Sequence, residues 1–187
     1  MNQQQKNFLL TLARTAISDI VTTGEKLKAN LKEIDEEMLQ TRSTFVTLTI
    51  EDALRGCIGH LTAFQPLYQD VIDNAIAAAT KDERFFPVDE KELPTISIEI
   101  SILSHPQPLP YTSAKDLLDK LQPDVHGVIL SKGVIHQATF LPQVWEDLQD
   151  KELFLSQLCR KAGLETDAWK HEELKVEVYE VERFGEE

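Results

Sequence analysis

The most regular pattern in the chain is TISIEISIL, which occupies residues 95–103. Isoleucine stands at every second position, and the residues between are polar, namely Ser97, Glu99 and Ser101. Because successive side chains of a β-strand point to opposite faces of a sheet, this alternation predicts a strand with one buried face and one polar face. A second strand is predicted at residues 43–50, which are rich in β-branched and aromatic types and alternate at Val46, Leu48 and Ile50.

The rest of the chain mixes helical and strand patterns. Apolar periodicity predicts helices over residues 3–22, over about a dozen residues from Pro66, over 115–121, and around the stripe from Phe154 to Ala162. Further strands are expected at 53–61, in a hairpin of 125–131 and 134–139, and at 174–178 as the last strand. The segment 25–42 is either a loop or a short helix. Because no regular βαβ repeat is present, the pattern favours an α+β fold with a mainly antiparallel sheet flanked by helices.

Three prolines follow the isoleucine-rich segment, at Pro106, Pro108 and Pro110. They predict an extended linker that stays out of a sheet interior, because proline has no backbone N–H to donate. We therefore expect residues 1–187 to form one domain, with a lobe boundary near residues 104–112.

Charge and hydropathy exclude two classes of protein. The formal net charge is −13, no run of five or more basic residues exists, and the one basic cluster, at Lys26, Lys28 and Lys32, is mild, so binding to a nucleic-acid backbone is not expected. No apolar segment reaches the ~18 residues of a membrane span, and the N-terminus lacks the pattern of a signal peptide. We expect a cytoplasmic protein with no membrane contact, in which Cys57 and Cys159 are reduced thiols.

The segment LRGCIG, residues 54–59, is unusual for a strand because it holds two glycines. In an extended chain Arg55, Cys57 and Gly59 share one face. A guanidinium beside a thiol stabilises the thiolate and lowers its pKa, which is the condition for a reactive cysteine. The glycines Gly56 and Gly59 would leave the sulfur accessible and the backbone amides free to bind an anion. Cys57 and Arg55 are therefore the candidate catalytic residues.

The competing interpretation is that Cys57 is a small buried hydrophobe, as free cysteines commonly are. Cys159 lies on an apolar helical stripe and is expected in the core. A metal shared by Cys57 and His60 would require a tight turn, since the two side chains point to opposite faces of a strand. No second pair with comparable spacing exists, so no metal site is expected.

Other polar residues are weaker candidates. Glu99 could act as a base, Arg84 could bind an anion or pair with an acid, and His136 could be a general base, but each has an ordinary solvated or structural alternative. The chain has no phosphate-binding loop, no G-x-G-x-x-G, no H-E-x-x-H and no G-x-S-x-G, so no cofactor is expected. Whether the protein is an enzyme stays open.

Several ordered blocks resemble one known family, the AMME-chromosomal-region domain, whose bacterial and archaeal members are called AmmeMemoRadiSam system protein A. The resemblance runs from the first helix to Phe184 and is carried by the blocks FVTL at 45–48, LRGCIG at 54–59, NAIAAA at 74–79, DERF at 82–85, ELP at 92–94, FLPQVW at 140–145 and LCRKAGL at 158–164. Two departures are Glu83, which replaces a proline of the family motif, and residues 134–139, which lack a basic stretch found in relatives.

The resemblance implies a larger and a smaller lobe with a cleft between them. The Arg55-Gly56-Cys57 block matches the family motif directly, which implies that Cys57 lies in a functional site. Gene neighbourhoods in the family imply a Memo-like protein and a radical-SAM enzyme as partners, without naming a reaction. The candidate ligand-binding residues are Gly56, Ile58, Gly59, Arg84, Glu99, His136 and Gln143.

Two functions remain open from the sequence. In the first, a cleft centred on LRGCIG binds a small anionic ligand or acts on it, with Cys57 as the reactive thiol. In the second, the protein is a non-catalytic adaptor and Cys57 is structural. The reactivity of Cys57 distinguishes them.

Overall fold

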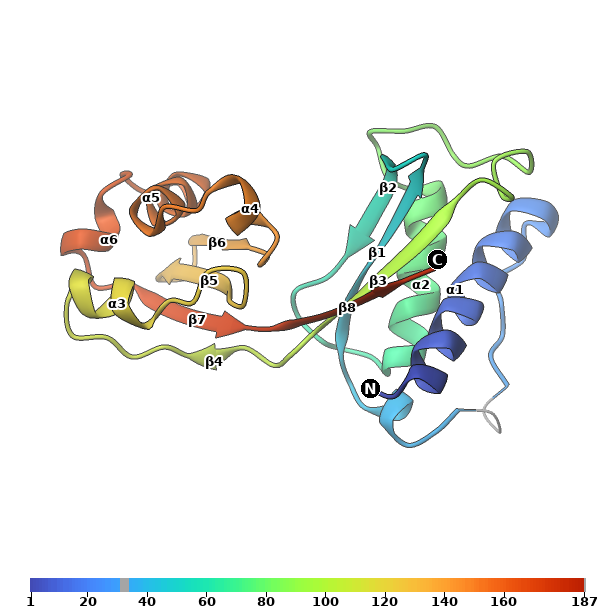
Figure 1. Ribbon diagram of the computed structural model, residues 1–187, viewed down its shortest axis with the longest axis horizontal. Helices are drawn as coiled ribbons and strands as arrows, with labels where there is room; N and C mark the ends of the chain where they lie inside the picture. Colours follow the sequence, from blue (N-terminus) through green and yellow to red (C-terminus); the bar gives the residue numbers. More distant parts are fainter. Residues whose placement is uncertain (31–33, 187) are drawn as a thin grey trace. The chain divides into compact units, whose positions relative to one another are not determined.

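The computed structural model describes residues 1–30 and 34–186, which form two compact units. Unit 1 comprises Met1–Leu103 together with the chain from Glu182 onward, and unit 2 comprises Ser104–Val181. Unit 2 is therefore inserted in the sequence of unit 1 (Figure 1). Among the described residues, no helix is both long enough and apolar enough to cross a membrane.

Unit 1 is built on a four-stranded sheet with the strand order β2-β1-β3-β8. Its strands are β1 (Ser43–Ile50), β2 (Ala53–Gly59), β3 (Ser97–Leu103) and β8 (Val181–Gly185). The central strand β1 pairs antiparallel with β2 on one side and with β3 on the other. The turn between β1 and β2 consists of Glu51 and Asp52, both with positive φ angles. The two strands predicted from the sequence at 43–50 and 95–103 are thus neighbours in one sheet.

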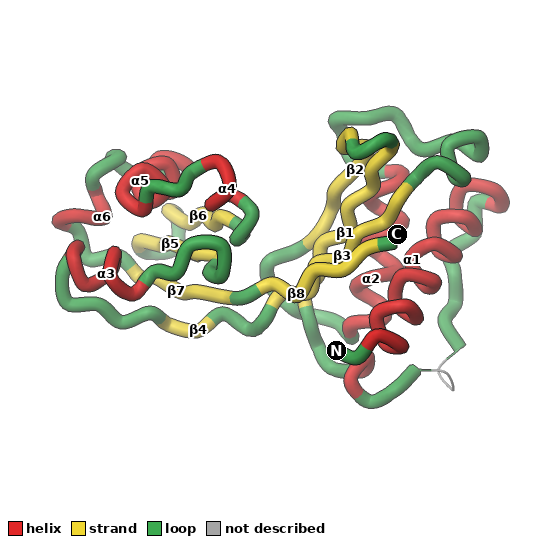
Figure 2. Tube along the Cα trace, in the orientation of Figure 1, coloured by secondary structure: helices red, strands yellow, loops and turns green. Residues whose placement is uncertain are grey.

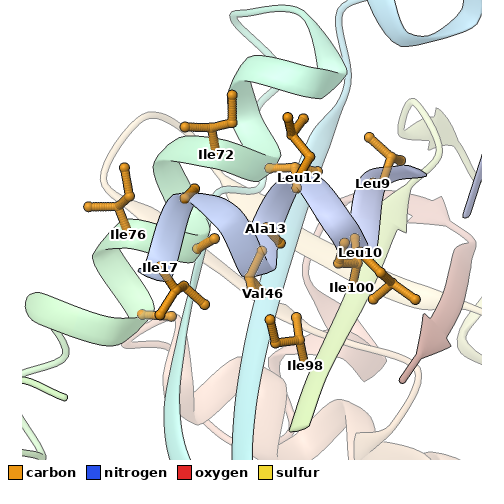
Figure 3. Close-up of a cluster of buried hydrophobic side chains, with 14 of the residues drawn as sticks. Leu9, Leu10, Leu12, Ala13, Ile17, Val46, Ile72, Ile76, Ile98 and Ile100 are labelled. Carbon is orange, nitrogen blue, oxygen red and sulfur yellow. The ribbon is translucent and has the colours of Figure 1, made fainter. Parts of the chain in front are cut away.

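Two helices, α1 (Gln3–Thr23) and α2 (Leu67–Thr80), cover one face of this sheet (Figure 2). The alternating apolar side chains of β1 and β3 point into the core beneath them, with Val46, Ile98 and Ile100 fully or almost fully buried. Figure 3 shows these side chains meeting the apolar stripe of α1, which includes Leu9, Ala13 and Ile17. The opposite face of the sheet carries the alternate, polar residues, and we call it the polar face.

The ends of α1 follow the signals in the sequence. Asn2 and Gln5 form a reciprocal capping box at its N-terminus, and Gly24 ends it in the left-handed conformation with φ 75°. In the segment 25–42 the described residues contain only the short 3-10 helix η2 (Glu37–Leu39), and residues 31–33 lie outside the described part of the chain.

Unit 2 holds a second four-stranded sheet, with the order β4-β7-β5-β6 and antiparallel pairing throughout. Its strands are β4 (Gln107–Pro108), β5 (Gly127–Lys132), β6 (His136–Phe140) and β7 (Lys175–Tyr179). Its helices are α3 (Ala114–Lys120), α4 (Val144–Asp147), α5 (Lys151–Lys161) and α6 (Ala168–His171). The core contains Leu158, Cys159 and the stacked rings of Trp145 and Phe154, whose centroids are 3.5 Å apart.

The expected α+β class, with antiparallel sheets flanked by helices, is confirmed, but three details differ from expectation. The strand at 174–178 is not the last one, because the acidic C-terminal segment forms β8 next to β3. The hairpin turn in unit 2 extends over residues 133–135, so Val134 lies in the turn rather than in a strand. The proline-rich segment contributes the two-residue strand β4, which lies at a sheet edge, where proline is tolerated.

Candidate functional site

Cys57 lies on the edge strand β2, with its side chain half-buried on the polar face of the unit 1 sheet. Thr47 of β1 is its cross-strand partner, and the Thr47 hydroxyl donates a hydrogen bond to Cys57 Sγ over 3.3 Å. Thr47 is also the cross-strand partner of Glu99 on β3. Because directly paired residues of a sheet point to the same face, Cys57, Thr47 and Glu99 form one polar row across three strands.

The backbone of Cys57 is held by an ion pair from the loop after α2. Its N–H donates to Asp82 Oδ2 over 2.8 Å, and its carbonyl accepts a hydrogen bond from Arg84 Nη2 over 3.4 Å. Asp82 and Arg84 are themselves joined by a 2.6 Å ion pair. The two side chains thus satisfy the backbone groups that an edge strand leaves unpaired, and they fix the position of the thiol.

The hydrogen bonds between the two side chains set the electrostatics of this ion pair. The Asp82 side chain is 5% exposed, and the hydrogen bonds that Arg84 donates hold the pKa of that carboxyl well below its usual range. The same contact raises the pKa of the Arg84 guanidinium. The Arg84 side chain is 56% exposed, so one side of a permanently charged guanidinium is open to an incoming anion.

Arg55 is bound to a different carboxylate. Its Nε lies 2.6 Å from Glu92 Oε1, and its Nη2 donates to the Phe86 carbonyl over 3.0 Å. The hydrogen bond from Arg55 lowers the pKa of Glu92, while the Arg55 pKa is raised. The sequence suggested that this guanidinium would serve the thiol, whereas the structure ties it to Glu92.

One aromatic ring connects the two ion pairs. The guanidinium carbons of Arg55 and Arg84 lie 5.8 Å and 5.6 Å from the centroid of the Phe85 ring. At these distances both cations are attracted by the negative face of the ring. The DERF block therefore acts as a unit, in which Asp82 and Arg84 bind the Cys57 backbone and Phe85 lies near both guanidinium groups.

The two glycines of LRGCIG serve close packing. A Cβ atom at Gly56 would lie 2.3 Å from the Ala78 carbonyl oxygen of α2, and a Cβ atom at Gly59 would lie 2.3 Å from the Thr44 carbonyl oxygen. Both distances are far below a normal contact, so only glycine lets the backbone approach this closely. The two glycines thus have a packing role, and anion binding at their backbone amides stays a prediction.

The remaining sequence candidates are distributed over different places. Ile58 points to the helix-covered side of β2, away from Cys57, and Glu99 is 3.3 Å from Arg183 Nε of β8 on the polar face. His136 and Gln143 belong to unit 2. The Nδ1 atom of His136 is 3.0 Å from the Ala162 carbonyl oxygen, and Gln143 Oε1 is buried without a hydrogen-bond partner among the described residues.

Cys159 provides the contrast to Cys57 within the same chain. It is fully buried on α5, and this burial raises the pKa of its thiol. Its sequence context, an apolar helical stripe, predicted this placement.

Sequence reasoning missed Glu92 and Thr47 as partners of the LRGCIG segment, and it did not foresee the contact between Asp82 and the Cys57 backbone. The one signal in the sequence that pointed to the contact with Asp82 was that LRGCIG and DERF both belong to the blocks that carry the family resemblance. Across residues 1–30 and 34–186, no group of three or more His, Cys, Asp or Glu side chains is arranged to hold a metal ion. The chemistry that these residues offer is a thiol beside a hydroxyl, two arginines and two acids.

Comparison with known proteins gives a consistent result. The family model AMMECR1 matches residues 10–184. The protein MK0488 of Methanopyrus kandleri is 35% identical over 192 residues, which cover 98% of this chain and 89% of that protein. A protein of Methanosarcina mazei is 39% identical over 172 residues, or 90% of this chain and 85% of its own length.

A solved structure agrees with these matches. The crystal structure of the uncharacterised protein PH0010 from Pyrococcus horikoshii has a TM-score of 0.88 and 35% identity, covering 100% of this chain and 94% of that one. The matches span nearly the whole chain and agree in sequence and fold. The chain therefore belongs to the AMMECR1 family.

Proposed function

We propose that the protein binds a small anionic ligand on the polar face of unit 1, with Cys57 as the reacting thiol. The observation that carries this proposal is the position of Cys57 Sγ, which accepts a hydrogen bond from Thr47 while Asp82 and Arg84 hold the backbone on either side of it. This arrangement supports the proposal, because a nucleophile works best when its strand and its polar neighbours hold it in a fixed position.

The anionic character of the ligand follows from Arg84. Its guanidinium is fixed by Asp82 yet more than half exposed, so it can donate to a carboxylate or phosphate without losing its present partner. Arg55 is less suited to direct contact, because its side chain is only 14% exposed and is bound to Glu92. In this proposal Arg84 binds the ligand and Arg55 positions the loop that carries Arg84.

The family resemblance extends the proposal to partners and compartment. A Memo-like protein and a radical-SAM enzyme would act in the same process, either upstream or downstream of the Cys57 ligand. A cytoplasmic location would keep Cys57 reduced and therefore reactive.

The test is the rate of alkylation of each cysteine by iodoacetamide in the folded protein, read by peptide mass spectrometry. Cys159 is the internal control, because its thiol is fully buried. We expect Cys57 to react at least about 100-fold faster than Cys159, and we expect phosphate or short carboxylates to slow the reaction at Cys57. An Arg84→Gln variant should lose this protection, whereas a Lys120→Gln variant in unit 2 should keep it.

If Cys57 reacts only as fast as Cys159, through unfolding, the thiol proposal fails. If Cys57 reacts quickly but no anion protects it, the anionic ligand is wrong and the reactive thiol stands. These two outcomes separate the two parts of the proposal.

A second candidate function is that of an adaptor, and one observation favours it. Val134 and Ile135, in the turn between β5 and β6, are 100% and 86% exposed, which is unusual for adjacent aliphatic side chains. An adaptor would use such a turn to contact a partner protein. Replacing both residues with serine should then abolish co-elution with a purified Memo-like protein on a sizing column, while alkylation of Cys57 stays unchanged.

A further inference from the structure

The side of strand β2 that faces away from Cys57 borders a cavity of about 730 Å³ in unit 1. Its walls come from the end of α1, the loop that follows it, α2 and β2, and include Ile20, Ile58, His60, Asn74, Ala77 and Lys81. A cavity of this size is in the range of small-molecule sites. Neither Cys57 nor Arg84 lines it, so it is separate from the site on the polar face.

A buried carboxylate lies behind the cavity wall. Asp70 of α2 is completely buried and accepts hydrogen bonds from the Thr44 N–H over 2.8 Å and from the Thr44 hydroxyl over 2.7 Å. Gln65 Nε2 and Asn74 Nδ2 each donate to it over 3.0 Å. Asp70 is thereby fixed in position and compensated by several donors, as a buried carboxylate must be.

His60 connects this carboxylate to the cavity. Its Nδ1 atom lies 3.2 Å from Asp70 Oδ1, and its side chain is 37% exposed. Asn74 Nδ2 lies 3.4 Å from the same Nδ1 atom, so Nδ1 faces the buried cluster and Nε2 is the ring nitrogen left for a ligand hydroxyl. The ring of Phe64 lies edge-on at 4.8 Å and restricts the imidazole further. A histidine oriented by a buried acid is a common arrangement in binding and catalytic sites.

Asn74 contributes an acceptor beside His60. Its Nδ2 atom contacts Thr44, Asp70 and His60 Nδ1, while no hydrogen bond to its Oδ1 atom occurs among the described residues. Thr44, Asp70 and Asn74 are sufficient to tie α2 to β1. His60 is not needed for that connection. Its partly exposed ring is therefore available to contact a ligand in the cavity.

The other end of the cavity is cationic. Lys26 is neutralised by Asp73 at 2.6 Å, but Lys81 has no ion pair within the described part of the chain. Lys81 follows Asn74 by seven residues, which places it about 10 Å further along the direction of α2. In a protein with a net charge of −13, a lining with surplus positive charge is the exception, and it indicates an anionic ligand group at this end. Between the two ends the wall is largely aliphatic, with Ile20, Ile58, Ile76 and Ala77.

We propose that this cavity binds a small linear hydroxy acid, with its hydroxyl on His60 Nε2, its carboxylate on Lys81 and its aliphatic body along the isoleucines. The step of about 10 Å along α2 from Asn74, beside His60, to Lys81 sets the length of the probe at about six carbons. His60 Nε2 hydrogen-bonds the hydroxyl, Asp70 and Asn74 position His60, and Lys81 supplies the charge. The site is independent of the Cys57 ligand, because β2 separates the two.

The test is a binding titration followed by NMR of the His60 imidazole, with 6-hydroxyhexanoate as the probe. Two matched compounds each lack one end, namely hexanoate without the hydroxyl and 1,6-hexanediol without the carboxylate. We expect 6-hydroxyhexanoate to shift the His60 Nε2 resonance and to bind about tenfold more tightly than either matched compound.

Variants assign the contacts. Lys81→Gln should weaken 6-hydroxyhexanoate about tenfold and leave hexanediol unchanged, and His60→Gln should remove the preference for the hydroxyl. Ala77→Leu should fill the cavity and abolish binding, and its circular dichroism spectrum verifies that the fold is kept. Cys57→Ser and Lys28→Gln should bind like the original protein.

Three outcomes would overturn the proposal. One is the absence of any His60 shift at millimolar probe. Another is undiminished binding by the folded Ala77→Leu variant. The third is equal binding of all three compounds, which would show that only the aliphatic wall is recognised. The Cys57→Ser variant retains this cavity. Failure of the cavity proposal is therefore seen in the binding titration, whereas failure of the thiol proposal is seen in the alkylation rates.

Discussion

The two cysteines of the chain lie in regions that hold a thiol in opposite ways. On β2 of unit 1, Cys57 is fixed by hydrogen bonds to its backbone and its sulfur, at the edge of a sheet and on its polar face. On α5 of unit 2, Cys159 is fixed by apolar packing, and burial is the main cause that raises its pKa above the ordinary value. The comparison teaches that a thiol can be held in place in two ways, by hydrogen bonds from polar neighbours at a sheet edge or by apolar side-chain packing in a core.

The largest effect is expected from Gly56→Ala, which tests how closely β2 must approach α2. The new Cβ would lie 2.3 Å from the Ala78 carbonyl oxygen, so the strand or the helix must move, at a cost of about 3 kcal/mol in the free energy of unfolding. Urea unfolding followed by circular dichroism measures this loss. Gly133→Ala is the control, since it has open space and only the strain of φ 63°, worth about 1 kcal/mol. Equal losses for the two variants would refute the packing role of Gly56.

The next largest effect is expected from replacing each cysteine with serine. Cys159→Ser places a hydroxyl in a fully apolar core and should lower the free energy of unfolding by about 2 kcal/mol. Cys57→Ser should change it by less than about 0.5 kcal/mol, because Thr47 can hydrogen-bond a serine hydroxyl as well. Thermal and urea unfolding of the two variants, run in parallel with the original protein, measure both losses in the free energy of unfolding. A larger loss at Cys57 would mean that this thiol is structural.

A smaller effect is expected from Asp82→Asn, which breaks the ion pair that holds the Cys57 backbone. The amide keeps the shape of the side chain but loses the charge that pairs with Arg84, so we expect a loss of about 1.5 kcal/mol. Asp116→Asn in unit 2 removes an exposed helical ion pair with Lys120 and should cost clearly less. If the two losses are the same in urea unfolding, Asp82 has no special part in holding β2.

The smallest effect is the pH dependence of the stability difference between the original protein and the Asp82→Asn variant. The pKa of Asp82 is depressed in the folded protein, so its contribution is complete above the unfolded pKa, near 4, and is lost as the pH falls through the folded value. The stability difference between the original protein and Asp82→Asn should therefore be constant from pH 7 to about pH 5 and shrink from about pH 4 downward. A difference that grows in acid would contradict this direction.

The sequence predicted local structure well where one segment determines it. The alternation in β3, the strand character of β1, the end of α1 at Gly24 and the burial of Cys159 all follow from residue types within a few positions. The strand β8 was missed because the segment Val181–Gly185 is short and its VERFG sequence has no clear alternation of apolar and polar residues. They acquire strand structure only through the neighbouring β3.

The same limit applied to the candidate site. The sequence identified LRGCIG and DERF as segments of interest, but it assigned Arg55 to the thiol. The partner of Arg55 is Glu92, 37 residues away, and no local pattern specifies such a contact. The acid behind His60 was missed for the same reason, since Asp70 lies in an amphipathic helix where an acidic residue is ordinarily solvent-exposed.

The place of β8 has a consequence for how the protein is made. Glu186, at the end of this strand, receives hydrogen bonds from Arg14 of α1 and from the Ile98 backbone of β3. Every residue of unit 2 lies between β3 and this segment in the sequence. A ribosome therefore completes the whole of unit 2 before it releases the strand that finishes unit 1, so the first unit to be started is the last to be closed. Until then the outer edge of β3 stays unpaired, and an unpaired strand edge can pair with a neighbouring chain.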